Sequence, residues 1–157
     1  MRRPAPGVIA IAGAIVMVGV MANGALWARA ATVTGDVKTE LRTTIFHAAE
    51  LAQRATALVG VRVHVQHVIN CLEGPNGADF KTDVGYPCEG MGHGIIPDLK
   101  DAIAAKTPGA DQALKQATLA WNLAVQGISK NDVQEIQAWA RVVANHLNAS
   151  LSALGSK

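Results

Sequence analysis

Aromatic and charged side chains are both scarce in this sequence of 157 residues, at 4% and 17% respectively. Cavities for large hydrophobic ligands are usually lined by aromatic and bulky side chains, so we do not expect one here. The few cationic residues form no stripe that could follow a phosphate backbone, which argues against a nucleic-acid partner. Hydrophobic residues make up 50% of the chain, too many for an intrinsically disordered protein, and the length predicts one folded domain.

Recognised catalytic signatures are also missing. The sequence has no G-x-S-x-G, no H-E-x-x-H and no phosphate-binding loop, and it has no C-x-x-C pair. The absence of C-x-x-C excludes a thioredoxin-type redox pair and covalent attachment of a c-type haem. We therefore assign no catalytic residue, and we expect a binding or structural role rather than an enzyme.

The first 30 residues have the features of an export signal. Arg2 and Arg3 form a positive start, an apolar stretch follows, and the small residues at 28–30 suit a signal peptidase. We predict that the domain 31–157 is exported to the periplasm or the extracellular space after removal of 1–30. The apolar stretch is also long enough to span a bilayer, so a retained membrane anchor stays open as the alternative. Only in that case do we expect contact with a membrane.

Cysteine is limited to Cys71 and Cys88. Disulfides persist in oxidising compartments, so export predicts that these two residues are bonded to each other. In the chain-entropy model a disulfide that closes such a short loop stabilises the fold by ~3 kcal/mol. Two free, buried thiols are the alternative.

Apolar residues recur at helical spacing through the rest of the chain, and no segment alternates with the period of a strand. The predicted helices cover 36–59, 61–73, a short segment around Asp98, 108–128 and 133–154, with a break at Gly60 and a glycine-rich loop at 74–94. Amphipathic helices of this kind bury their apolar stripes against one another. We predict an all-α fold, an antiparallel four-helix bundle whose glycine-rich loop between the second and third helices is tied by the disulfide.

Unusual chemistry is concentrated between residues 64 and 93. At about 100° per residue, His64, His67 and Cys71 lie on one side of the predicted helix 61–73, away from its apolar stripe. If Cys71 pairs with Cys88, the loop must fold back over this side of the helix. The histidines would then lie beneath the loop.

Two interpretations of these histidines stay open. In the first, His64, His67 and His93 bind a zinc or copper ion, with Glu89, Met91 or water as a further ligand, because imidazole nitrogens suit both metals. In the second, the histidines bind no metal, and they and Asn70 only clamp the loop by donating hydrogen bonds to its carbonyls. The second interpretation predicts a structural or partner-binding bundle, and the sequence identifies no partner.

His47 and His146 are weaker candidates, because each lies at the edge of the apolar stripe of its own helix. If the first and last helices are neighbours, the two imidazoles could approach each other and ligate a haem iron. Haem is not expected, since the sequence has so few aromatic residues.

The segment from His64 to Asp98 resembles a group of small exported bacterial helical proteins. The resemblance rests on H-V-Q-H-V-I-N-C-L-E-G-P-N-G, on Asp79-Phe80 and on P-C-E-G-M-G-H-G. It implies a shared helix-and-loop unit and no particular activity. Cys71 and Cys88 are additions to the pattern of that group, and they would replace part of the packing of the loop with a covalent bond.

Overall fold

The computed structural model describes residues 30–155, and the regular elements within that range are all helical. They are α1 (Ala30–Phe46), the π-helix η1 (His47–Leu51), α2 (Ala52–Arg54), α3 (Leu58–Glu73), the 3-10 helix η2 (Thr82–Val84), α4 (Ile95–Ala104), α5 (Ala110–Ile128) and α6 (Val133–Ala153). The predicted all-α class is confirmed. Apart from its last residue, the predicted export segment 1–30 lies outside the described residues.

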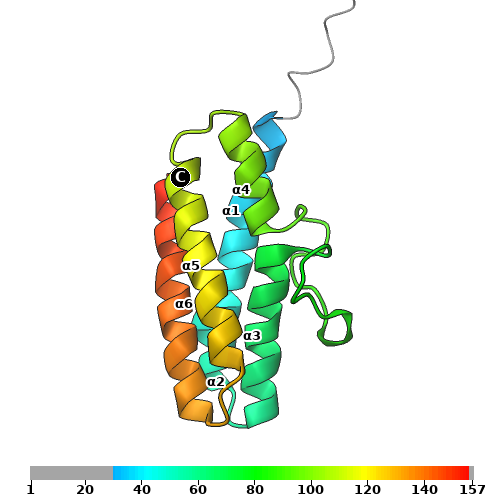
Figure 1. The fold of residues 1–157 in the computed structure, drawn as a ribbon, viewed down its shortest axis with the longest axis vertical. Helices are drawn as coiled ribbons and strands as arrows, with labels where there is room; N and C mark the ends of the chain where they lie inside the picture. Colours follow the sequence, from blue (N-terminus) through cyan, green and yellow to red (C-terminus); the bar gives the residue numbers. More distant parts are fainter. Residues whose placement is uncertain (1–29, 156–157) are drawn as a thin grey trace, which may run out of the picture.

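The long helices α1, α3, α5 and α6 lie side by side, and the short helix α4 packs against α1 and α5 (Figure 1). The loop between α3 and α4 projects beside α3, on the side of the molecule away from α6 (Figure 1). Among the described residues, no helix combines the length and apolar character needed to cross a membrane.

Small side chains form much of the contact between α5 and α6, which pack along most of their lengths. The buried side chains on these helices are mainly Ala113, Ala117, Ala120, Ala124, Ile136, Ala140, Val143, Ala144 and Leu147. Gly127 is one point of close approach, since a Cβ atom added there would lie 2.7 Å from Cβ of Trp139. Alanine and glycine thus let the two helices come close together.

The first helical segment ends earlier than the sequence predicts. The break expected at Gly60 is wrong, because the chain leaves the helix at 55–57 and Gly60 lies inside α3. The amide of Gln137 on α6 donates to the backbone carbonyls of residues 52, 53 and 55 at 3.0 to 3.2 Å. These are carbonyls that the end of a helix leaves unpaired, so a side chain distant in sequence stabilises the break.

The earlier break changes what the neighbouring residues do. Val59 belongs to the predicted apolar stripe, yet it is 71% exposed because α3 starts at Leu58 and turns it outward. Gly60 lies within the first turn of α3, where an added Cβ would make an ordinary contact of 3.4 Å with Cβ of Ala55.

The predicted disulfide is confirmed: Cys71 on α3 is bonded to Cys88, and both residues are fully buried. The two ends of the loop also meet, because a Cβ added to Gly94 would lie 2.5 Å from the backbone nitrogen of Gly74. Both glycines have positive φ angles, 72° and 112°, a conformation that other residues rarely adopt. The loop is therefore closed at its base and tied again at the disulfide.

Candidate metal centre

Three histidines meet between the first helical segment and α3. His47 is the first residue of η1, and His64 and His67 lie on α3. One ligand nitrogen from each imidazole lies within 4.8 Å of the other two. Nδ1 of His47 is 3.2 Å from Nδ1 of His67, and the three ring centroids are 4.8 to 5.8 Å apart. A single metal ion could be held by these three nitrogens.

The turn at 55–57 explains why His47 joins this group. The number of residues between His47 and the turn is about the same as the number between the turn and His64 or His67. Because the two helices form a hairpin, all three side chains lie at a similar distance from the turn. With the break placed at Gly60, this correspondence is lost. Equal spacing on either side of a turn is therefore the sequence signal that could have identified His47.

The π-helix is a second reason why helical arithmetic misses His47. A π-helical turn contains about one more residue than an α-helical turn. Angular positions around the helix axis that are calculated at 100° per residue are therefore wrong for side chains beyond it. Single π-turns within α-helices occur frequently at functional sites. Here the π-turn, His47–Leu51, begins at the histidine itself.

A backbone carbonyl fixes the orientation of one imidazole. Nε2 of His67 lies 2.5 Å from the carbonyl oxygen of Val84 in η2. A carbonyl oxygen only accepts, so Nε2 carries the proton and Nδ1 presents its lone pair towards His47. Metal-binding histidines are commonly oriented in this way by a hydrogen bond from the other ring nitrogen.

Burial keeps two of the imidazoles neutral. Desolvation, followed by the proximity of His67 and His64, lowers the pKa of His47 to about 4. Desolvation and His67 also lower the pKa of His64, whose buried Nδ1 has no hydrogen-bond partner in the described part of the chain. At neutral pH both rings are therefore uncharged, which is the form that binds metals.

The residues predicted as ligands divide into two sets. The structure brings His64 and His67 together, but it places His93 elsewhere. The side chain of His93 is 83% exposed, and its Nδ1 lies 3.2 Å from Oδ1 of Asp98. Met91 accepts a hydrogen bond at its sulfur from Thr43 on α1, and the side chain of Glu89 is exposed.

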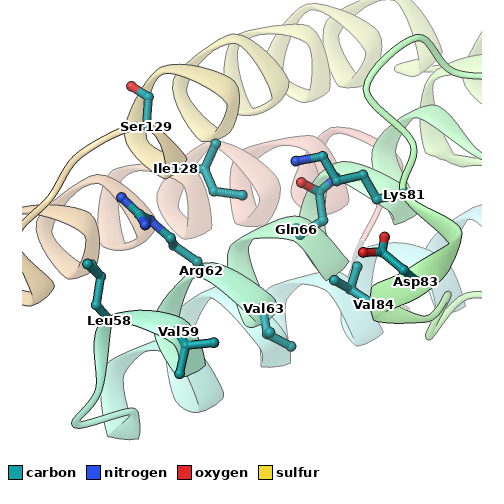
Figure 2. Close-up of a pocket in the computed structure, with 10 residues that line it drawn as sticks. All are labelled: Leu58, Val59, Arg62, Val63, Gln66, Lys81, Asp83, Val84, Ile128 and Ser129. Carbon is teal, nitrogen blue, oxygen red and sulfur yellow. The ribbon is translucent and has the colours of Figure 1, made fainter.

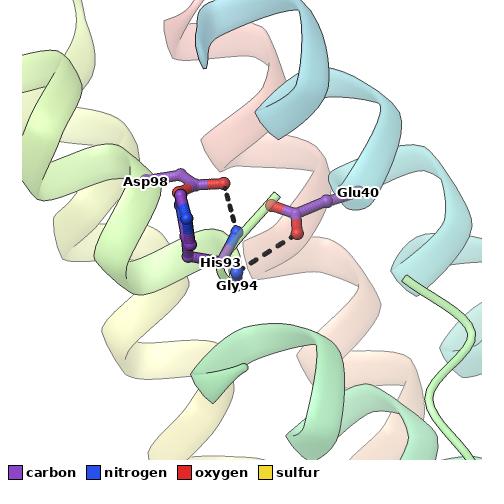
Figure 3. Close-up of polar contacts among 4 residues, drawn as sticks. All are labelled: Glu40, His93, Gly94 and Asp98. Carbon is purple, nitrogen blue, oxygen red and sulfur yellow. Dashed lines mark hydrogen bonds and ion pairs between the residues drawn. The ribbon is translucent and has the colours of Figure 1, made fainter. Parts of the chain in front are cut away.

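The position of His93 follows from the way the loop ends. The backbone N–H of His93 donates to Asp98, and that of Gly94 donates to Oε1 of Glu40 on α1, as Figure 3 shows. Glu40 and Asp98 are almost completely buried. These two carboxylates hold the end of the loop against α1 and α4, so the His93 imidazole does not join the group of three.

Amides, more than histidines, attach the loop to α3. Asn70 is fully buried, and its side chain donates to the carbonyls of Lys81 and Gly85 and accepts from the N–H of Lys81, at 2.7 to 3.0 Å. Gln66 donates to Asn70 at 3.1 Å and to the carbonyl of Asp79 at 2.8 Å. The expected clamp is present, and His67 is the histidine that contributes to it.

His146 does not belong to the group. Its Nδ1 lies 2.8 Å from Oε1 of Gln116 on α5. The haem arrangement considered for His47 and His146 therefore has no support in this geometry, since His47 is directed to α3 instead.

The candidate ligands are all of one kind. The group consists of three imidazoles and contains no carboxylate or thiolate. Three protein ligands leave a fourth position of a tetrahedral ion for water or another small ligand. Comparison with protein-family models, curated proteins and solved structures finds no match for this chain.

Proposed function

We propose that this protein is an exported helical protein that binds one zinc or copper ion through His47, His64 and His67. The carrying observation is the approach of their ligand nitrogens to within 4.8 Å of one another. In a tetrahedral zinc site the ligand nitrogens are ~3.3 Å apart, given Zn–N bonds of ~2.0–2.1 Å. The 3.2 Å between Nδ1 of His47 and Nδ1 of His67 fits this spacing, and the distances to the His64 nitrogen, at most 4.8 Å, would shorten by up to about 1.5 Å on binding.

The unused nitrogens favour metal binding over a purely structural role. If the histidines served only to clamp the loop, each imidazole would be expected to form a hydrogen bond with the backbone of the loop. Asn70 and Gln66 already make most of these bonds, and the buried Nδ1 of His64 has no partner in the described part of the chain. A metal ion would give the His64 imidazole a partner and would take the place of the hydrogen bond between Nδ1 of His47 and Nδ1 of His67.

The scaffold and location complete the proposal. The four long helices form the antiparallel bundle that the sequence predicts, and residues 1–30 direct its export and are then removed. The Cys71–Cys88 disulfide supports a compartment outside the cytoplasm. The resemblance to small exported bacterial helical proteins is part of the same proposal, and a bundle anchored by an uncleaved first segment is its alternative.

Metal content tests the proposal directly. The exported protein, purified without a histidine tag and dialysed against zinc or copper and then buffer, is expected to retain about one ion per chain by elemental analysis. His47→Ala and His64→Ala should each reduce affinity at least tenfold in a competition titration with a chromophoric chelator. His93→Ala and His146→Ala are the matched controls and should bind as the wild type does.

The results also separate the two interpretations of the histidines. Absence of bound metal in the wild type would overturn the proposal, and loss of metal in His93→Ala equal to that in His47→Ala would overturn the assignment of the ligands. If no metal binds and His67→Ala still destabilises the protein, the loop-clamp role is the better account. With metal binding, an ion at 100 times its dissociation constant should stabilise the fold by ~2.7 kcal/mol.

A further inference from the structure

A pocket of about 780 Å³ lies between α3, the end of α5 and the η2 segment. Leu58, Val63, Val84 and Ile128 give it apolar walls, and Arg62 and Lys81 are its two cationic residues. Figure 2 shows Arg62 and Lys81 on opposite sides of the view, with Ile128 and Val63 between them. The pocket therefore combines an apolar middle with a positive group at each end.

Arg62 lines this pocket without a carboxylate to balance its charge. Its Nη2 donates to the carbonyl of Lys130 at 2.7 Å and to Oδ1 of Asn131 at 2.8 Å, and both acceptors are neutral. Among the described residues no carboxylate pairs with this guanidinium, so its positive charge is left for an anionic ligand to balance.

Lys81 provides the second positive group. Its backbone is held by Asn70 through bonds of 2.7 and 3.0 Å, so its position in the pocket wall is fixed although its side chain is exposed. Within the described range, no ion pair involves Lys81 or Arg62. Asp83 is the single acidic residue of the lining and is exposed, so the net charge of the pocket is positive.

We propose that this pocket binds a small organic anion with an apolar body, of the class of medium-chain carboxylates. The carboxylate pairs with the guanidinium group of Arg62, and the alkyl chain lies along Val63, Ile128 and Val84. Small-molecule sites typically combine an apolar lining with a few polar groups that orient the ligand, and their volumes fall in the range of this pocket. The inference is independent of metal binding, because no ligand of the metal centre lines the pocket.

Three probes with the same alkyl chain test the charge preference. Octanoate, octanol and octylammonium are titrated into the full-length exported protein and followed by calorimetry. Octanoate is expected to bind at least tenfold more tightly than octanol, and octylammonium is expected to bind least. Equal affinity for octanoate and octylammonium would overturn the proposal, as would the absence of octanoate binding at millimolar concentration.

Variants then locate the site. Arg62→Met should weaken octanoate binding at least tenfold, and Lys81→Met a few-fold. Lys115→Met is the matched control, because Lys115 lines a separate apolar hollow with Leu114 and Leu119 and should not affect octanoate.

The bonds of Arg62 to residues 130 and 131 make folding of Arg62→Met a separate question. Arg62→Lys keeps the charge but removes the planar guanidinium, and it should weaken binding by an intermediate factor. Thermal melting by circular dichroism identifies which variants are folded. Folded Arg62→Met and Lys81→Met proteins that bind octanoate as the wild type does would contradict the assignment.

Discussion

The two sides of this molecule are held together in different ways. On one side, α5 and α6 pack through alanine, glycine and a few larger apolar residues. On the other, α3 and its loop are joined by buried amides, an imidazole and a disulfide. The reason is the backbone: helices satisfy their own N–H and C=O groups, whereas a loop without regular structure needs partners from side chains. This polar side, α3 with its loop, also contributes two of the three histidines of the candidate metal centre.

The largest expected effect comes from removing the central amide of the polar side. Asn70→Ala should destabilise the protein by about 3–5 kcal/mol, because two loop carbonyls and one N–H lose their partner inside the fold. Urea unfolding measures the change. Asn122→Ala is the matched control, since that exposed amide donates to Thr118 within its own helix and should have an effect below about 0.5 kcal/mol. Equal effects of the two variants would contradict the comparison.

Opening the disulfide should have the next largest effect. Replacing Cys71 and Cys88 by alanine is expected to lower the free energy of unfolding by about 3 kcal/mol, the value for a loop of this length. Native-state hydrogen exchange should show the largest loss of protection in the loop and the adjacent part of α3. A loss there no greater than that in α5 and α6 would contradict the comparison.

The apolar side should be sensitive to added volume. Gly127→Ala places a Cβ 2.7 Å from Cβ of Trp139, so the helices must separate, at a cost of about 1–3 kcal/mol. Gly60→Ala is the control, because its Cβ would make an ordinary 3.4 Å contact and alanine favours a helix. Thermal unfolding should give Gly127→Ala a lower melting temperature than the wild type and Gly60→Ala a higher one.

Acid should have the smallest of these effects on the free energy of unfolding. The pKa of His47 is about 4 in the folded protein and about 6.5 when unfolded, so the unfolded chain binds more protons as pH falls between these values. The metal-free protein should therefore lose stability from pH 6.5 towards pH 4, with no further loss from this group below that. Because the imidazole is only partly buried, we expect only about 1 kcal/mol.

Urea unfolding across this pH range measures the effect. His47→Gln should flatten the dependence, whereas His146→Gln should leave it unchanged. An unaltered slope in His47→Gln would assign the acid sensitivity to other groups.

The helices and the disulfide could be predicted from the sequence because their causes are local. Apolar periodicity identifies α3, α5 and α6 to within a few residues, and Gly74-Pro75 marks the end of α3. Asn70 was also recognisable as a group that could bind loop carbonyls, since it shares the end of α3 with Cys71. In the candidate metal centre, His64 and His67 could be identified because their spacing puts both imidazoles on the same side of one helix.

The third histidine depended on the tertiary structure. Local spacing by itself determined that this chain is helical, that two cysteines face each other across a short loop, and that two imidazoles share a helix face. Where the first helix stops is decided by Gln137, about 80 positions further along, whose amide binds the carbonyls freed at the break. That distant contact aligns His47, instead of His93, with the other two, because convergence of side chains depends on how whole helices pair and not on the sequence around each residue.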